Sequence, residues 1–366
     1  MSTCFDVFSG ARVLVTGHTG FKGSWLSIWL RALGAEVFGV ALEPPSRPSH
    51  FEAAGLASEM GDSRLDVRDR DGLSAQISEL CPDFVFHLAA QPLVRRSYAN
   101  PAETYETNVI GTLNVLEGLR RLSKPCVAVL ITSDKCYDNV EWVWGYRETD
   151  PLGGGDPYSA SKGAAELVIR SHVRSFFSQA NSPIRIGVGR AGNVIGGGDW
   201  AEDRIVPDCV RAWSAKQEVQ LRNPLATRPW QHVLEPLSGY LALAAALQAD
   251  SAQHGEAFNF GPPAEQNCSV LELVSGMSKY WDSVRWTDAG DCGAGPHESG
   301  LLKLNCDKAL HRLKWRATLN LESTIRMTAQ WYRNYYNGGE NVLAMTRDQI
   351  AEYSRTAKNA GLAWAQ

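Results

Sequence analysis

Two short stretches of the sequence bring together side chains that can do acid–base chemistry. Tyr158 and Lys162 are four residues apart, so on a helix they share one face. A neighbouring ammonium stabilises a phenolate, and we therefore expect Lys162 to lower the pKa of Tyr158 and make it a base near neutral pH. Ser133, Asp134 and Lys135 place a hydroxyl, an acid and a potential base side by side. The alternatives are that Tyr158 and Lys162 form a surface pair without a function, and that Asp134 and Lys135 form an ordinary turn pair.

The elements expected around these residues place both stretches at one edge of a sheet. Five apolar runs are typical of buried strands: 12–16, 36–42, 84–88, 126–132 and 184–189. Helical spacing appears in three longer segments: 20–34, 104–122 and 157–177. This alternation predicts an α/β fold, a doubly wound parallel Rossmann sheet covered on both faces. Ser133 follows one strand and Tyr158 begins a helix, so both lie at the carboxyl ends of strands, where such sheets bind ligands.

A glycine-rich loop precedes the first predicted helix. Gly17, Gly20 and Gly23 follow a strand and open a helix, which is the setting that a dinucleotide-binding loop requires. Glycine lets the backbone approach a pyrophosphate, and a helix N-terminus offers free N–H groups and a positive dipole end. A tight structural turn is the alternative. We predict that NAD binds here, at Gly17, Thr19, Gly20, Phe21, Lys22 and Gly23.

The residues expected to contact the adenosine are less regular. Glu43 lies twenty residues after Gly23 and just past the second strand, which favours NAD. Ala41 and Leu42 occupy the usual position of the ribose-binding acid, so NADP stays open. Asp66 and Val67 are expected at the adenine edge, with a helix cap as the alternative for Asp66.

Composition sets wider limits on fold and function. The chain has 366 residues, of which 44% are hydrophobic and 21% charged, as in an ordinary globular protein. Its net charge of −4 gives no drive toward nucleic acid or an anionic membrane. No stretch has the features of a signal peptide or a membrane span, no metal site is expected, and the eight cysteines form no C-x-x-C pair. These features predict a cytoplasmic protein with reduced thiols.

The alternation of predicted strands and helices stops near residue 190, where glycine and proline residues interrupt it. We expect a dinucleotide-binding domain over 1–190 and a smaller mixed α/β lobe over 191–366 that covers the site, with some segments returning to the first domain. Helical segments are predicted in this lobe at 208–215, 237–249 and 270–280.

These features resemble the extended short-chain dehydrogenase/reductase family of nucleotide-sugar enzymes, over most of the chain. Beyond the residues above, the likeness is carried by the segments 87–91, 108–112, 191–200, 203–208 and 227–236. Related dTDP-glucose dehydratases typically carry Asp-Glu where this chain has Asp134-Lys135. That departure points to the branch that acts on CDP-glucose.

The resemblance implies a redox-neutral conversion of CDP-glucose to CDP-4-keto-6-deoxyglucose and water, in deoxysugar and surface-polysaccharide (lipopolysaccharide O-antigen) synthesis. Tyr158, helped by Lys162 and Ser133, would take the proton of the C4 hydroxyl while NAD accepts the C4 hydride. Lys135 would remove the C5 proton, Asp134 would protonate the departing C6 hydroxyl, and the hydride would return to C6. Burial would lower the pKa of Lys135 and raise that of Asp134, but their mutual attraction opposes both shifts, so this division of roles is a hypothesis.

Further ligand contacts follow from the same resemblance. Additional cofactor contacts are expected at Leu88, Ala89, Ala90, Thr107 and Thr132. Substrate contacts are expected at Gln91, Asn193, Arg204, Ile205, Val206, Arg228, His232 and His297. The two arginines suit a diphosphate, since guanidinium forks match phosphate oxygens, with structural ion pairs as the alternative. A structural role is equally open for the two histidines.

Three other functions compete with this prediction, and the first is a 4,6-dehydratase that acts on another nucleotide sugar. A 4-epimerase needs Tyr158 and Lys162 but no elimination pair, so Asp134-Lys135 favours a dehydratase. A non-catalytic dinucleotide sensor would usually lose the Tyr158–Lys162 pair. In the family, the counterparts of helices 104–122 and 157–177 pair with a second subunit as a four-helix bundle. The resemblance therefore implies a homodimer and leaves a tetramer open.

Overall fold

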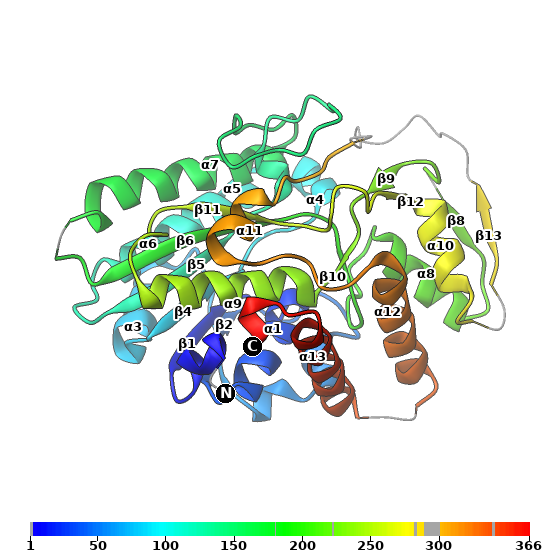
Figure 1. The fold of residues 1–366 in the computed structure, drawn as a ribbon, viewed down its shortest axis with the longest axis horizontal. Helices are drawn as coiled ribbons and strands as arrows, with labels where there is room; N and C mark the ends of the chain where they lie inside the picture. Colours follow the sequence, from blue (N-terminus) through cyan, green and yellow to red (C-terminus); the bar gives the residue numbers. More distant parts are fainter. Residues whose placement is uncertain (1–2, 180, 222, 282–283, 289–300, 339–340) are drawn as a thin grey trace.

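The structure, a computed structural model, describes residues 3–179, 181–221, 223–281, 284–288, 301–338 and 341–366. Seven parallel strands form one central sheet in the order β11-β6-β5-β4-β1-β2-β3 (Figure 1). Their bounds are β1 (Arg12–Thr16), β2 (Glu36–Ala41), β3 (Gly61–Arg64), β4 (Phe84–His87), β5 (Cys126–Ile131), β6 (Ile184–Ala191) and β11 (Ala257–Phe260). The α/β Rossmann prediction is confirmed.

The strand order reverses between β1 and β4, which fixes where a ligand can enter. From β1 the chain builds β2 and β3 on one side, then crosses to β4 and continues to the other edge. The carboxyl ends of these two strands are tied by Thr16, whose hydroxyl lies 2.7 Å from Nδ1 of His87. In open α/β sheets the crevice at such a reversal is the ligand site.

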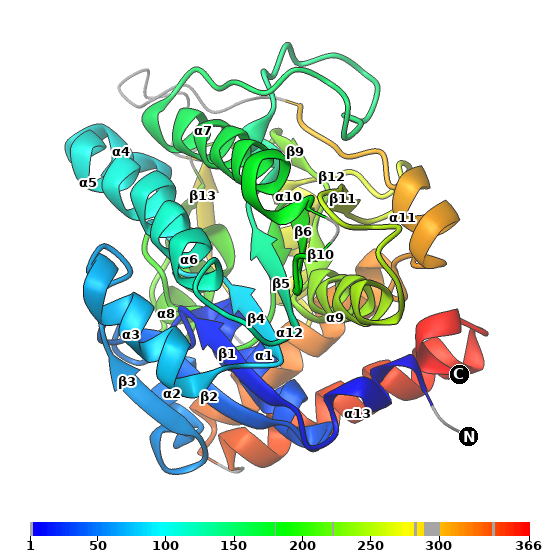
Figure 2. The same ribbon diagram turned by 90° about the vertical axis from the view of Figure 1, so that its left-hand side faces the viewer.

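Helices cover both faces of the sheet (Figure 2). One face packs against α3 (Arg70–Leu80), α6 (Gly111–Leu119) and α7 (Pro157–His172). The opposite face packs against α1 (Phe21–Ala32) and α9 (Leu234–Ala249), both rich in buried apolar side chains. The strands between them are therefore apolar on both sides, as parallel strands require.

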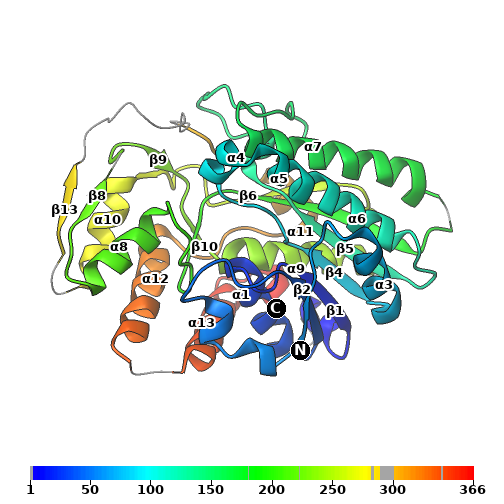
Figure 3. The same ribbon diagram turned by 180° about the vertical axis from the view of Figure 1, so that it is seen from behind.

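Shorter and more peripheral helices complete the chain. They are α2 (His50–Ala53), α4 (Val94–Ala99), α5 (Pro101–Tyr105), α8 (Ile205–Ser214), α10 (Val270–Ser278), α11 (Asp307–Leu313), α12 (Leu321–Tyr336) and α13 (Val342–Asn359). Helices α12 and α13 were not predicted from the sequence. Seen from behind, α13 lies beside α1, so the end of the chain returns to the Rossmann sheet (Figure 3).

The segment predicted as one helix over 104–122 is broken into three pieces. Helix α5 leads into a π-helical turn, Glu106–Ile110, and α6 follows. The wider turn contains Asn108, whose buried side chain donates to the carbonyl oxygen of Gln91 and to Oγ of Ser161. A π-helical turn often marks a functional site. A second π-helical turn, Val173–Phe177, ends the helix predicted over 157–177.

A smaller mixed lobe stands at one end of the sheet, at the right of Figure 1. It contains α8, α10 and two short two-stranded sheets, β8 (Val219–Leu221) with β13 (Trp286–Asp288), and β9 (Thr227–Arg228) with β12 (Cys268–Ser269). A further pair, β7 (Val194–Ile195) with β10 (Gln231–His232), leads into it. Strand β11 and helix α9 come after residue 190 in the sequence but lie on the central sheet. The domain boundary at residue 190 stays a prediction. Among the described helices, none is long and apolar enough to cross a membrane.

Candidate active site

The glycine loop joins β1 to α1 in close contact with the loop after β4. Gly17 has a φ of +76°, and a Cβ there would lie 2.7 Å from the backbone nitrogen of Ala89. A Cβ on Gly23 would clash with the carbonyl oxygen of Gly17. Gly20 caps α1, and no side chain fills the cap. The backbone N–H groups at this helix end are thus left for a ligand, and the loop fits the pyrophosphate of a dinucleotide.

Beyond the glycine loop, the end of β2 carries a cluster of charged residues. Glu43 is exposed, and its carboxylate lies 3.5 Å from Nε of Arg64, which also pairs with Asp62 at 3.0 Å. Asp62 in turn lies 2.8 Å from Nε2 of His18 in the glycine loop. Thr19 donates to the carbonyl oxygen of Leu42, at 3.0 Å. Sequence reasoning missed Asp62 and Arg64, which come from the neighbouring strand β3.

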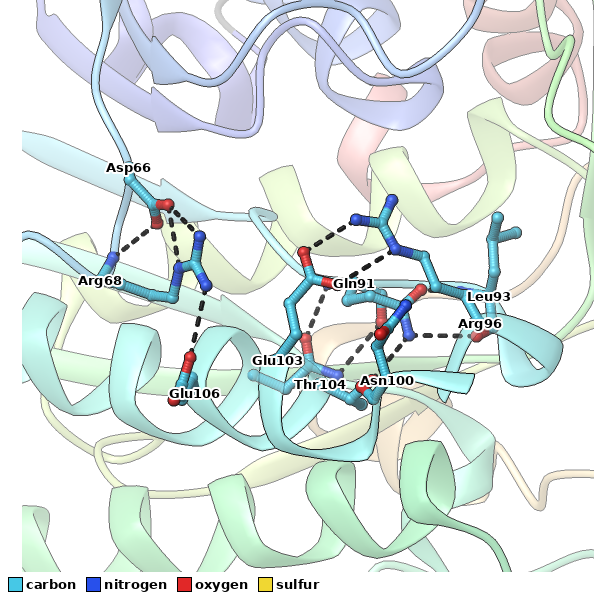
Figure 4. Close-up of polar contacts among 10 residues, drawn as sticks. Asp66, Arg68, Gln91, Leu93, Arg96, Asn100, Glu103, Thr104 and Glu106 are labelled. Carbon is cyan, nitrogen blue, oxygen red and sulfur yellow. Dashed lines mark hydrogen bonds and ion pairs between the residues drawn. The ribbon is translucent and has the colours of Figure 1, made fainter. Parts of the chain in front are cut away.

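Asp66 lies beyond β3 and does not cap a helix. Its carboxylate accepts from the backbone N–H of Arg68 and pairs with the Arg68 guanidinium at 2.6 Å (Figure 4). Asp69 is the residue that caps α3, so the alternative reading of Asp66 as a cap is wrong. Val67 is buried against Gly111. The adenine contact of this pair stays a prediction.

The acid–base turn follows β5 directly. Ser133 caps the short 3-10 turn Asp134–Cys136 and donates to Oδ1 of Asp134, at 2.9 Å. Asp134 is buried and its Oδ2 lies so close to Gly192 that a Cβ there would come within 2.7 Å. Burial raises the pKa of Asp134, and the charges of Lys135 and Lys22 only partly oppose that shift. A carboxyl in this setting is suited to donate a proton.

Tyr158 and Lys162 both lie buried in the first turns of α7. Nζ of Lys162 lies 6.0 Å from the centre of the Tyr158 ring, so they share a face as predicted. Burial raises the pKa of Tyr158 to about 12, Asp134 adds to this rise, and the Ser133 hydrogen bond and Arg204 oppose it. The expected lowering is therefore wrong for this structure, because desolvation of the phenolate outweighs nearby positive charge. Burial also lowers the pKa of Lys162, to about 8.

Two further cations join this group. Burial lowers the pKa of Lys22 to about 8, repulsion from Arg204 and Lys162 lowers it further, and Asp134 opposes the shift. Arg204 donates to Asp199 at 2.7 Å, the ion pair that was the structural alternative for this residue. The sequence predicted Lys22 only as part of the cofactor loop. In the structure the charge of Lys22 also acts on Asp134, in the turn after β5.

Thr132 lies at the end of β5 and points into a buried ion pair. Its hydroxyl donates to Oε1 of Glu166 at 2.6 Å, and Glu166 receives two hydrogen bonds from Arg190. Neither charged residue was singled out from the sequence. Glu166 is four residues after Lys162, and this spacing was the signal that could have found it. Thr107, in the π-helical turn, and Leu88 and Ala90, beside the glycine loop, are half-buried.

The predicted substrate residues divide into two groups. Gln91 is satisfied within the fold, since its amide donates to Leu93 and Thr104 and accepts from the Leu93 N–H (Figure 4). His232 is fully buried against Trp25, and burial lowers its pKa to about 3. These positions favour structural roles and do not support a substrate contact.

The remaining substrate candidates lie around the smaller lobe. Asn193 and Ile205 are half-buried, and Val206 is buried in α8. Arg228 donates to the carbonyl oxygen of Thr227 at 2.8 Å. His297 lies outside the described residues. Their substrate contacts stay predictions.

Comparison with known proteins agrees with this geometry. The family model for GDP-mannose 4,6 dehydratase matches residues 14–328. A CDP-glucose 4,6-dehydratase of Salmonella typhimurium is 49% identical over 95% of this chain and 97% of its own length.

Solved structures show the same fold at low identity. UDP-glucose 4-epimerase of Thermus thermophilus, in complex with NAD, is 24% identical with a TM-score of 0.73, over 88% of this chain and 99% of the other. UDP-glucose 4-epimerase of Thermotoga maritima, with UDP-glucose, is 22% identical with the same TM-score and the same coverage. The chain belongs to the GDP-mannose 4,6 dehydratase family, within the extended short-chain dehydrogenases/reductases.

Proposed function

We propose that this chain converts CDP-glucose to CDP-4-keto-6-deoxyglucose and water, with NAD as a recycled cofactor. The observation that carries the proposal is the buried group of Asp134, Tyr158 and Lys162, where a carboxyl whose pKa is raised by burial lies beside a tyrosine–lysine pair. Paired groups whose environments push their pKa values apart are typical of acid–base catalysis. The high identity to a CDP-glucose 4,6-dehydratase supports the choice of sugar nucleotide.

Each catalytic side chain has one proton to move. The glycine loop would hold NAD, which would supply the hydride acceptor for oxidation at C4 and the hydride donor for reduction at C6. Tyr158 accepts the proton of the C4 hydroxyl, assisted by Lys162 and Ser133. Lys135 removes the proton at C5, and Asp134 gives its proton to the C6 hydroxyl, which leaves as water. Lys135 returns the proton to C5 as C6 is reduced, and the proton taken from the C4 hydroxyl replaces the one that Asp134 lost. A protonated Asp134 carries no charge, so the anion that raises the pKa of Tyr158 is absent when Asp134 is ready to act.

Binding is assigned to the two sides of the crevice. The glycine loop, Glu43 and Asp66–Val67 would hold the dinucleotide, together with the loop after β4. The positive charge of Arg204 acts on Tyr158. Arg204 belongs to the smaller lobe over 191–366 and would neutralise the diphosphate of the substrate. Lys22 would add a second cation to the same region.

The proposed assembly is a homodimer through the α5–α6 and α7 helices, with a tetramer open. Exposed apolar side chains on this face support it: Tyr105, Ile110 and Leu167 are 39%, 45% and 48% exposed. Sedimentation of Leu167→Glu should give a monomer where the unchanged chain gives a dimer. We place the enzyme in the cytoplasm, in deoxysugar synthesis for a surface polysaccharide such as O-antigen.

The function is tested by incubating the enzyme separately with CDP-glucose, dTDP-glucose and GDP-mannose. Mass spectrometry should detect loss of one water from CDP-glucose, without net reduction of added NAD. Turnover of another sugar nucleotide in its place would overturn the substrate assignment. A product of unchanged mass and altered stereochemistry at C4 would identify a 4-epimerase instead.

A further inference from the structure

A buried ion pair contacts the residue that directly precedes the Ser133–Lys135 turn. Glu166 on α7 and Arg190 on β6 have side chains that are only 5% and 4% exposed. Nε and Nη2 of Arg190 donate to the two carboxylate oxygens of Glu166, at 2.7 and 2.9 Å. Such two-pronged contacts are the strongest type of ion pair, yet burying both charges is costly for the fold. The pair has no step in the proposed reaction, so its position needs another explanation.

The ion pair connects four elements at the carboxyl edge of the sheet. Glu166 accepts the hydroxyl hydrogen bond of Thr132, the last residue before the acid–base turn. Arg190 donates from Nη1 to the hydroxyl of Tyr137, at 2.7 Å, and Tyr137 donates to Asn259 on β11, at 2.8 Å. The turn from Ser133 to Cys136 is therefore bracketed by two residues that bond to this ion pair, Thr132 before it and Tyr137 after it.

The carboxylate of Glu166 also acts on Lys162. The two residues are four apart on α7, and the charge of Glu166 favours the protonated lysine against the effect of burial. Cys136 lies close as well, but burial raises the pKa of its thiol well above the ordinary value, so it is uncharged near neutral pH. The titratable groups that interact with Lys162 are Tyr158, Lys22, His87, Cys136 and Glu166.

We propose that Glu166 is a positioning residue for the dehydration: held by Arg190, it fixes Thr132 and so the Ser133–Lys135 turn, and it keeps a negative charge one helical turn from Lys162. This inference rests on the proposed function. Glu166 touches neither substrate nor cofactor in this role and acts through Thr132 and Lys162.

The first test is the pH profile of Glu166→Gln with CDP-glucose. Loss of the carboxylate leaves Lys162 easier to deprotonate, so the alkaline limb of kcat should move to lower pH by about one pH unit. We expect kcat to fall about tenfold at neutral pH, with KM within about twofold of the unchanged chain. A folded variant whose alkaline limb stays in place would overturn the proposal, because a purely structural role predicts lower stability without that shift.

Glu235→Gln is the matched control. Glu235 is also a buried glutamate on a long helix, but it lies on α9 and bonds to the backbone N–H groups of Thr318 and Leu319. Its substitution should leave the pH profile of kcat in place. An equal shift of the alkaline limb in both variants would show a general effect of buried glutamates and would also overturn the proposal.

A second pair of variants keeps the proposal testable if Glu166→Gln fails to fold, since Arg190 then loses its counter-charge. Thr132→Val removes only the hydroxyl bond and leaves the ion pair intact, and Thr132→Ser restores the hydroxyl. We expect Thr132→Val to lower kcat about tenfold without a matching change in KM, and Thr132→Ser to recover it. Unchanged kcat in Thr132→Val, or no rescue by serine, would refute the positioning role.

These outcomes are distinct from failure of the proposed function. If the unchanged chain forms no dehydrated product from CDP-glucose, the proposed function fails, and the inference fails with it. If the unchanged chain is active and either Glu166→Gln or Thr132→Val gives the contradicting result described above, only the role of Glu166 is wrong.

Discussion

Glu166 and Glu235 are both buried glutamates on long helices, but the protein surrounds them differently. Glu166 pairs with the guanidinium of Arg190 and accepts a hydrogen bond from Thr132, the residue before the acid–base turn. Among the residues that the structure describes, Glu235 receives only hydrogen bonds, from two backbone N–H groups and the hydroxyl of Tyr353 at 2.8 Å. Burial raises the pKa of Glu235 to about 7, although those hydrogen bonds oppose the shift. Hydrogen bonds alone thus leave a buried carboxyl close to protonation at neutral pH.

The surroundings of Glu166 are a cluster of charged groups, whereas those of Glu235 are neutral groups that hold helices and loops together. Around Glu166, charged and titratable groups with shifted pKa values gather at the carboxyl edge of the sheet, among them Asp134, Lys162 and Lys22. Around Glu235, neutral groups connect α9 with α13 and with the segment before α12. Changes in the first region should therefore act on the reaction, and changes in the second on stability.

The largest expected effect is in the catalytic region, with Lys135→Met. Removal of the base at C5 should lower formation of the 4-keto-6-deoxy product by about 10³-fold. Oxidation at C4 precedes that step, so a single turnover should still reduce bound NAD, measured by absorbance of the reduced nicotinamide. Undiminished product formation would falsify the assignment of Lys135.

Asp134→Asn should come next in size. The amide keeps the shape of the side chain but has no acidic proton for the C6 hydroxyl, so product formation should fall about 10²-fold. Reduction of bound NAD should persist, because an uncharged group beside Tyr158 does not raise its pKa. Asp138→Asn, at an exposed carboxylate four residues away, is the control. Equal loss of both half-reactions would argue that Asp134 serves the oxidation instead.

Glu235→Gln tests the other side of the comparison. The pKa of Glu235 is raised from 4.5 to about 7 in the folded chain, so the folded state binds a proton more tightly than the unfolded state. Its contribution to stability is present below pH 4.5 and is lost as pH rises toward about 7, a change of about 3 kcal/mol. Melting temperatures at pH 5 and pH 8 should fall less with pH in Glu235→Gln than in the unchanged chain. Parallel curves would show that Glu235 does not titrate with folding.

Tyr353→Phe should have the smallest effect. The variant loses the hydroxyl that donates to Glu235 and lies 2.9 Å from Oγ of Ser238, a cost of about 1 kcal/mol. Loss of this donor should also raise the pKa of Glu235 further and steepen the fall of melting temperature with pH. Activity below the melting transition should not change; a lower kcat would connect this region to the site after all.

Local sequence patterns were sufficient where the chain is regular. The glycine-rich segment 17–23 follows a strand and opens a helix as expected, and Tyr158 shares a face of α7 with Lys162. The helical spacing of side chains and the positions of the glycines predict these features, because the features depend on residues that are close in the sequence. The same patterns did not reveal the π-helical turn Glu106–Ile110, in which Asn108 makes buried hydrogen bonds to residues distant in sequence.

Other features were beyond any local pattern. His232 resembles a ligand-binding residue in its segment, but tertiary packing buries it against Trp25. Arg190 is the penultimate residue of β6, and nothing near it in sequence indicates that it pairs with Glu166. The expected fall in the pKa of Tyr158 rested on the sign of a neighbouring charge, whereas burial decides the shift.

The sequence by itself determined the alternation of strands and helices in the first half of the chain, the cofactor loop and the residue types available for catalysis, because these follow from local spacing. Only the tertiary structure decided which charges meet. Lys22, Asp134, Lys162 and Arg204 come from separate segments. They interact because α1, the turn after β5, α7 and α8 all begin near the carboxyl edge of the sheet. Burial at that edge then sets their protonation, since desolvation depends on every atom packed around a group and not on its neighbours in the chain.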